Sequence, residues 1–137
     1  MDRRVVEQKL ESLRRCLERV RARCPASVAL LAADPDAQDI VTLNLTRAIQ
    51  LCVDIAAHVL PDSAAVPQTM GETFERLVEA GRITPDLGLR LRRAVGFRNL
   101  AVHNYDAINW SIVHAIATKN IGDFDAFARA VFEGLPS

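Results

Sequence analysis

The sequence has few cysteines, few aromatic residues and almost no lysine. Its three cysteines, Cys16, Cys24 and Cys52, are odd in number and show no CxxC spacing, which argues against a disulfide framework and against a zinc site. The longest apolar run, residues 26–33, is far too short to cross a bilayer. Residues 1–7 alternate charged and apolar side chains without the apolar core of a signal peptide. These absences predict a cytoplasmic protein with no membrane association.

A net charge is also lacking, because 17 basic residues balance 17 acidic ones. A neutral chain does not coat nucleic acid by bulk electrostatics, so any anion site should be local. Fifteen of the basic residues are arginine, which suits bidentate phosphate recognition, although a codon bias would give the same ratio. A run of them near the N-terminus is interpreted as a solvated face rather than a guide for RNA: Arg14, Arg15, Arg19, Arg21 and Arg23.

Helical periodicity is present almost throughout the 137 residues, which suffice for one domain over 1–137. Cap and stripe patterns predict a helix over residues 2–23, another from Pro35 to about residue 60, a third over 69–80 and a fourth after Thr84. Asp106 is expected to cap a fifth, and residues 120–123 to break it and cap a last apolar segment. No stretch alternates at period two. The prediction is an all-α, up-down bundle of about five helices.

One residue breaks the apolar stripe of the fourth helix. At 100° per residue, Leu87, Leu91, Val95 and Val102 share a narrow arc, and Arg98 falls in its middle. A guanidinium on a core-facing position needs a partner, because its charge cannot be buried alone. Three readings remain open here: a pair with a carboxylate such as that of Asp54, a side chain that extends past the helix end, or a bound anion.

His103 follows five residues later and would point about 140° away from Arg98 on a continuous helix. The two side chains could then share one phosphate only if the helix ends near Val102 or if a second subunit supplies a facing copy. Asn104 and Asp106 favour a local break. An isolated histidine here is most often a helix C-terminal residue favoured by the dipole, and spacing alone does not decide.

The string Arg98-Asn99-x-x-x-His103-x-Tyr105 resembles the Arg-x4-His-x-Tyr motif of HEPN-superfamily ribonucleases, and it is most similar to the HepT-like toxin branch. The segment 94–97 before the motif, residues 44–56, and Asp123-Phe124 resemble the same branch in the same order. The resemblance covers most of the chain.

That resemblance implies a metal-independent endoribonuclease, without a cofactor, that acts as a homodimer with two motifs facing one cleft. His103 would move protons while the ribose 2′-OH attacks the adjacent phosphate, giving a 2′,3′-cyclic phosphate. Arg98 would hold the scissile phosphate of the RNA substrate, and Asn99 would orient His103 or that phosphate.

The resemblance also implies a partner, the minimal nucleotidyltransferase (MNT) antitoxin, which is associated with adenylylating the motif tyrosine. AMP on Tyr105 would put a bulky anion at the mouth of the RNA cleft. The alternative is that Tyr105 packs against the following helix with its hydroxyl hydrogen-bonded.

Other residues are supporting candidates. Asp54 and His58, four residues apart on the second long helix, are interpreted as a structural pair before a catalytic one. Arg90, Arg92 and Arg93 are candidates for RNA contact. An alternative to the ribonuclease is a non-catalytic HEPN-type module that binds a nucleotide or a partner protein.

Overall fold

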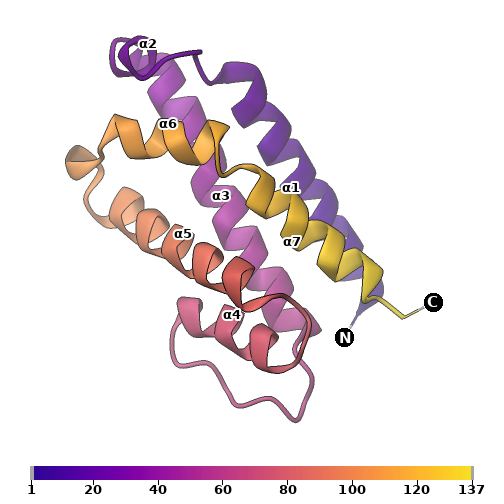
Figure 1. Cartoon of the computed structure of the whole chain (residues 1–137). Helices are drawn as coiled ribbons and strands as arrows, with labels where there is room; N and C mark the ends of the chain where they lie inside the picture. Colours follow the sequence, from indigo (N-terminus) through magenta and orange to yellow (C-terminus); the bar gives the residue numbers. More distant parts are fainter. Residues whose placement is uncertain (1, 137) are drawn as a thin grey trace.

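The computed structural model describes residues 2–136 and contains seven α-helices and one short 3₁₀ helix, with no strand in that range (Figure 1). The predicted all-helical fold is therefore confirmed. In chain order the elements are α1 (Arg3–Arg23), α2 (Val28–Ala32), α3 (Pro35–Val59), α4 (Met70–Glu79), α5 (Pro85–His103), η1 (Tyr105–Ala107), α6 (Trp110–Thr118) and α7 (Gly122–Glu133).

Six of the seven described α-helices begin where a polar side chain caps them; α7 follows Ile121 without a side-chain cap, although residues 120–123 were expected to supply one. Asp2, Asp34 and Thr84 accept hydrogen bonds from the first backbone N–H groups of α1, α3 and α5. A proline follows both Asp34 and Thr84, and its fixed φ suits the first helical turn. Helix α4 ends before Gly81, whose φ of 73° is the left-handed conformation that glycine adopts without strain.

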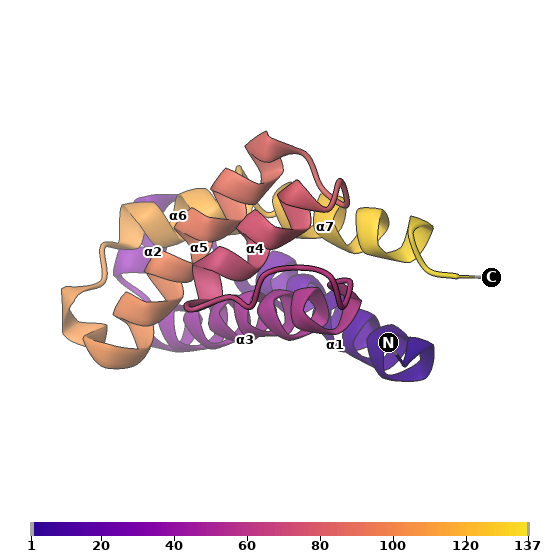
Figure 2. The same ribbon diagram turned by 90° about the horizontal axis from the view of Figure 1, so that it is seen from below.

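Two layers make up the bundle. Helices α1 and α3 run antiparallel along their length and form one layer, and α4 to α7 lie across them as the second (Figures 1 and 2). Between the layers lies one apolar core in which the rings of Phe74 from α4 and Phe127 from α7 meet edge to face, 5.9 Å apart. Both chain ends lie at the same end of the bundle.

Helix α3 is the centre of the fold, since it contacts each of the other six α-helices. By length and composition alone it would be able to cross a membrane, yet 56% of its most apolar window is buried inside the protein. Its apolar character is therefore that of a core helix.

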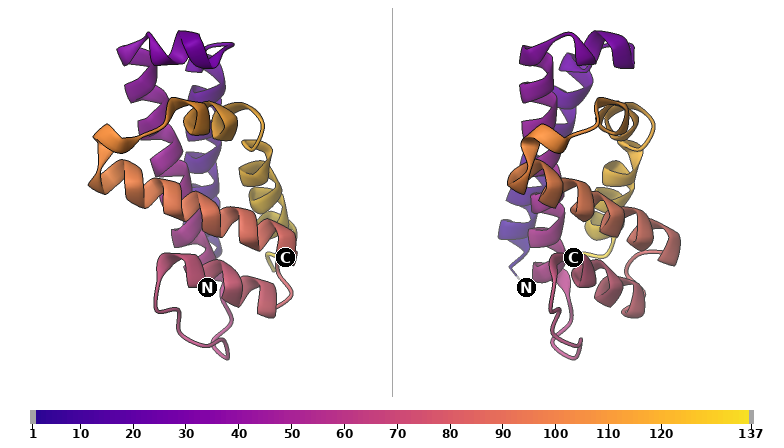
Figure 3. Two further views of the ribbon diagram at one scale, coloured as in Figure 1. Left: turned by 60° about the vertical axis from the view of Figure 1, so that its left-hand side comes forward. Right: turned by 90° about the vertical axis from the view of Figure 1, so that its left-hand side faces the viewer.

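Helix α5 crosses α3, and its C-terminal end with η1 projects at one edge of the bundle (Figure 3). Along this face of α5 the side chains become more exposed after the crossing. Leu91 and Val95 are buried, whereas Val102, two turns after Val95, is 52% exposed. The second half of α5 thus presents residues to solvent that a continuous apolar stripe would have hidden.

Two sequence predictions need correction. The apolar run 26–33 forms a helix of its own, α2, which Ser27 caps and which adds to the predicted number. Asp106 does not cap the next helix: it lies inside η1, and α6 starts at Trp110 after Asn109, whose side chain accepts from the backbone N–H of Ser111 at 2.8 Å. The asparagine was the better cap because it lies directly before the first helical turn.

Candidate active site

Helix α5 carries the Arg-x4-His motif without interruption. It continues through His103 and ends at Asn104, whose backbone N–H donates to the carbonyl of Leu100 at 2.8 Å. The expected helix end near Val102 is therefore confirmed to within one residue, but the break follows His103 and does not separate it from Arg98. Arg98 and His103 remain on one helix, about 140° apart around its axis.

Arg98 is half-buried, and none of the carboxylates in residues 2–136 forms an ion pair with it. Its Nη1 donates to Oδ1 of Asn99 at 3.1 Å. The reading that paired it with Asp54 is wrong, since Asp54 accepts from Gln50 at 3.0 Å and faces Lys9 at 3.8 Å. A guanidinium held by an amide, and not by a carboxylate, keeps its full charge for an anion.

Asn99 connects the two ends of the motif. It lies one residue from Arg98 and four residues from His103, so that Asn99 and His103 are about 40° apart on the same face of α5. Both side chains are exposed. The three residues therefore form an accessible arc in which an imidazole and a guanidinium flank one amide.

Tyr105 joins the end of this arc to α3. Its hydroxyl donates to Oδ1 of Asp39 at 2.7 Å, and its ring meets that of Trp110, the first residue of α6, edge to face at 6.1 Å. The side chain is nevertheless 40% exposed. The expectation of a hydrogen-bonded tyrosine packed on the following helix is confirmed, and the hydroxyl's partner comes from a third element.

The surroundings of Tyr105 raise the pKa of its phenol from 10 to about 12. Burial is the main cause, because it disfavours the phenolate, and the hydrogen bond to the Asp39 carboxylate acts in the same direction. Since the pKa is higher in the folded chain than in the unfolded one, this group stabilises the fold fully below pH 10. That contribution is lost as the pH rises toward about 12.

Replacing Asp39 with asparagine should lower the pKa of Tyr105 from about 12 toward 10. The amide removes the negative charge that repels the phenolate, while the part of the shift that comes from burial stays. Because Tyr105 is the single tyrosine of the chain, ultraviolet titration of the phenolate reports on it alone. Asp36→Asn, an exposed change of equal charge one turn earlier on α3, is the control; equal titration curves for the two variants would contradict the assignment.

Asp54 and His58 lie elsewhere. Asp54 is 15 residues beyond Asp39, which places it about 22 Å further along α3. His58 is exposed and donates no hydrogen bond to Asp54, whose carboxylate accepts from Gln50 and faces Lys9. The predicted i, i+4 pair is therefore wrong, and the structure brings neither residue to the motif.

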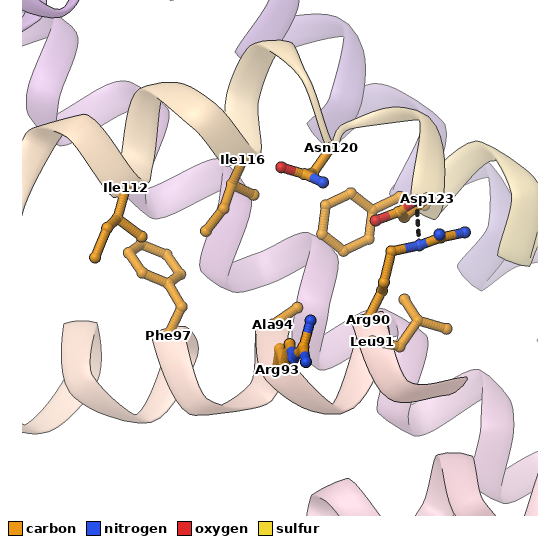
Figure 4. A pocket seen from close by; sticks show the side chains of 10 residues that line it. Arg90, Leu91, Arg93, Ala94, Phe97, Ile112, Ile116, Asn120 and Asp123 are labelled. Carbon is orange, nitrogen blue, oxygen red and sulfur yellow. Dashed lines mark ion pairs between the residues drawn. The ribbon is translucent and has the colours of Figure 1, made fainter. Parts of the chain in front are cut away.

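The arginines nominated for RNA contact are largely committed to carboxylates. Arg90 pairs with Asp86 at 2.5 Å and with Asp123 at 3.0 Å, and Arg92 pairs with Glu75 of α4. Arg93 forms no ion pair in residues 2–136 and lies at a pocket of about 310 Å³ between α5, α6 and α7 (Figure 4). Phe97 lines that pocket about 120° around α5 from His103, so the pocket and the histidine are on different faces.

Asp39 is the site residue that the sequence did not reveal. It precedes Tyr105 by 66 residues and is one of several acidic residues near the start of α3. No periodicity or spacing singles it out, because its contact exists only where α5 and η1 return to α3.

The chain is similar to known proteins over nearly its whole length. The sequence model of the family described as Ribonuclease HepT-like matches residues 7–131. An mRNA nuclease HepT from Shewanella oneidensis is 32% identical over 128 residues, which are 93% of this chain and 96% of that protein.

Two solved structures share the fold. The tri-AMPylated HEPN toxin of Shewanella oneidensis in complex with MNT antitoxin is 30% identical with a TM-score of 0.88, over 97% of this chain and 99% of that one. A toxin–antitoxin with AMP-PNP is 29% identical with a TM-score of 0.88, over 94% of this chain and 98% of that one.

Proposed function

Because the chain belongs to the HepT-like family of ribonucleases, we propose that it is the toxin of a HEPN–MNT toxin–antitoxin pair and cleaves RNA without a metal ion. The observation that carries the proposal is the accessible arc of Arg98, Asn99 and His103 beside Tyr105. An arginine without a carboxylate partner has the charge that a scissile phosphate requires, and a solvent-accessible histidine can exchange protons near neutral pH.

In the proposed reaction the ribose 2′-oxygen attacks the adjacent phosphorus and the bond to the 5′-oxygen breaks. His103 accepts the proton of the 2′-OH, and a protonated imidazole returns one to the leaving 5′-oxygen. Arg98, steadied by Asn99, stabilises the charge that grows on the phosphate oxygens. The products are a 2′,3′-cyclic phosphate and a free 5′-OH.

The proposed active form is a homodimer. The 140° between Arg98 and His103 prevents both side chains of one copy from facing the same phosphate squarely, so a second copy would complete the site. Exposed apolar side chains around the motif support such an interface, since Leu100 is 38% and Val102 52% exposed. On α5 Val102 lies within the arc, about 40° from Arg98, and Leu100 lies about 60° beyond His103.

The proposed partner is an MNT antitoxin that binds the chain and adenylylates Tyr105. Two observations support Tyr105 as the acceptor: it is the only tyrosine, and its ring is 40% exposed despite the hydrogen bond to Asp39. The tri-AMPylated toxin in complex with MNT antitoxin is a related protein that matches this chain along 97% of its length. Free thiols at all three cysteines are consistent with the proposed cytoplasmic location.

The purified, unmodified chain should cleave single-stranded RNA in the presence of EDTA and leave 2′,3′-cyclic phosphate ends, because the chemistry assigned to Arg98 and His103 needs no metal. The measurement is gel analysis of labelled RNA with chemical identification of the ends, beside an intact mass of the protein.

A chain of unmodified mass that binds RNA or the antitoxin but cleaves nothing would refute the catalytic proposal. The non-catalytic HEPN module would then be the better description. Activity that EDTA abolishes would contradict the metal-free mechanism.

A further inference from the structure

A second cationic surface lies away from the motif, in the groove between α1 and α3. The groove has a volume of about 680 Å³ and is lined by Arg15 and Arg19 from α1 and by Arg47 from α3. All three side chains are exposed, and the floor between them includes the buried thiol of Cys16. Three guanidinium groups from two helices therefore face one concave surface.

The charge of this groove is not neutralised. Among residues 2–136, Arg19 and Arg47 form no ion pair, and Arg15 has only a 3.5 Å contact with Glu11. Both Arg19 and Arg47 act electrostatically on the thiol of Cys16 and offset part of the rise in its pKa that burial causes. Asp54, the carboxylate at one end, is already engaged by Lys9 and Gln50.

Two other arginines of α1, Arg14 and Arg21, behave differently. Arg14 is held by Glu11 and Glu18 at 2.8 and 2.7 Å, and Arg21 pairs with Asp125 of α7. On the helix these two lie about 140° and 160° from Arg19. Arg14 and Arg21 thus lie on an ion-paired side of α1, whereas Arg15 and Arg19, which the sequence assigned to the same solvated face, form a charged wall of the groove.

The groove extends along α3 to Ile40, the residue next to Asp39. Around the axis of α3, the side chains that line the groove cover about 120°. Asp39 lies about 20° outside that range and one turn before Leu43. Asp39 accepts the hydroxyl of Tyr105, and Arg47 follows eight residues later, about 12 Å along the helix. Leu43, which is 49% exposed, lies between them and offers an apolar surface to a base or ribose.

We propose that the α1–α3 groove binds the sugar–phosphate backbone of the RNA substrate beyond the scissile bond, with Arg15, Arg19 and Arg47 contacting phosphates. This inference rests on the proposed ribonuclease function. Arginine without a carboxylate partner suits bidentate contact with phosphate oxygens. Because Arg47 lies about 12 Å from Asp39 along α3, the groove could hold phosphates of a strand that extends beyond the reacting nucleotides.

The test replaces Arg19 and Arg47 together with glutamine and measures binding of a labelled 20-nucleotide RNA by fluorescence anisotropy, in a His103→Ala background that leaves the RNA intact. The affinity should fall about tenfold at 0.1 M salt, and the slope of log K against log salt should become shallower by about 1.4, or about 0.7 for each phosphate that an arginine no longer neutralises. The control, Arg14→Gln with Arg21→Gln, makes the same charge change on the ion-paired side and should alter both quantities far less.

A second test restores His103 and compares substrates of two lengths. It distinguishes a loss of RNA binding in the groove from a defect in the active site. R19Q/R47Q should cleave a dinucleotide as the wild type does but lose about tenfold in kcat/KM on the 20-nucleotide RNA. Both arginines are exposed, so the variant should fold normally, which circular dichroism checks.

If R19Q/R47Q and R14Q/R21Q bind and cleave RNA equally, the groove does not bind RNA, and the ribonuclease proposal is unaffected. A wild-type chain that binds RNA through the groove but cleaves no RNA would refute the ribonuclease proposal and support RNA binding by the groove. If R19Q/R47Q weakens only the complex with the antitoxin, measured by calorimetry, the groove is a protein-binding surface and the proposal is wrong.

Discussion

Alanine in place of His103 should reduce RNA cleavage by about 10²- to 10⁴-fold, the range expected when a general acid–base catalyst is removed. His103 is exposed at the end of α5 and the described residues offer it no hydrogen-bond partner, so the change removes the imidazole without opening a cavity. The variant should therefore fold and bind RNA as the wild type does. Single-turnover cleavage of labelled RNA measures the loss.

Arg98→Ala should cost a similar factor, about 10²- to 10³-fold, because a donor aimed at the developing phosphate charge is removed. His58→Ala is the matched control, since His58 is also an exposed histidine but lies at the far end of α3. Cleavage that survives in His103→Ala, or that falls equally in His58→Ala, would contradict the assignment of the site to α5.

The same variants test whether two copies share one site. If Arg98 of one subunit works with His103 of the other, mixing Arg98→Ala with His103→Ala should restore part of the activity, because mixed dimers contain one site with both groups. If each site draws both residues from one chain, the mixture stays inactive. Sedimentation of the mixture checks that dimers form.

Adenylylation of Tyr105 should suppress cleavage by at least about 100-fold, because a bound anion would occupy the surface where the RNA phosphate has to enter. In the free chain the hydroxyl of Tyr105 donates to Asp39 at 2.7 Å. Esterification removes that proton and brings a phosphodiester charge beside the carboxylate, a repulsion that favours moving the ring away from α3. The η1 turn that carries Tyr105 begins two residues after His103, so such a shift would also disturb the histidine.

The measurement incubates the chain with antitoxin and ATP and then follows intact mass and cleavage on the same sample. Tyr105→Phe should gain no AMP and should keep its nuclease activity, since the phenyl ring still packs on Trp110. If the Tyr105→Phe chain is still modified, Tyr105 is not the acceptor. If the adenylylated chain cleaves RNA normally, the modification does not regulate cleavage.

The positions of the helices could be predicted because their signals are local. Asp34-Pro35 and Thr84-Pro85 start α3 and α5 as expected, and Gly81 follows the end of α4 at positive φ. The errors occurred where local signals compete or are short. Helix α2 has only five residues, too few for a periodic stripe, and the polar residues of 104–109 include more than one possible cap.

The surroundings of Arg98 illustrate a different limit. The wheel of α5 correctly placed it among apolar residues, yet the expected partner, Asp54, is bound to Gln50 and Lys9 near the other end of α3. A helical wheel describes the faces of one helix, whereas burial depends on where another helix crosses it. Beyond Val95 the face that carries Arg98 is only partly covered, so Arg98 is half-buried and Val102 is 52% exposed.

The helical class, most helix limits and the motif from Arg98 to Tyr105 follow from local sequence, since each depends on residues within a few turns of one another. The tertiary fold, in contrast, sets the hydrogen bond from Tyr105 to Asp39, the ion pairs of Arg90 with Asp123 and of Arg92 with Glu75, and the groove that Arg15 and Arg19 share with Arg47. Those contacts join residues 17 to 66 positions apart, and their existence follows from the crossing angles and register of packed helices, which core packing sets and no local pattern encodes.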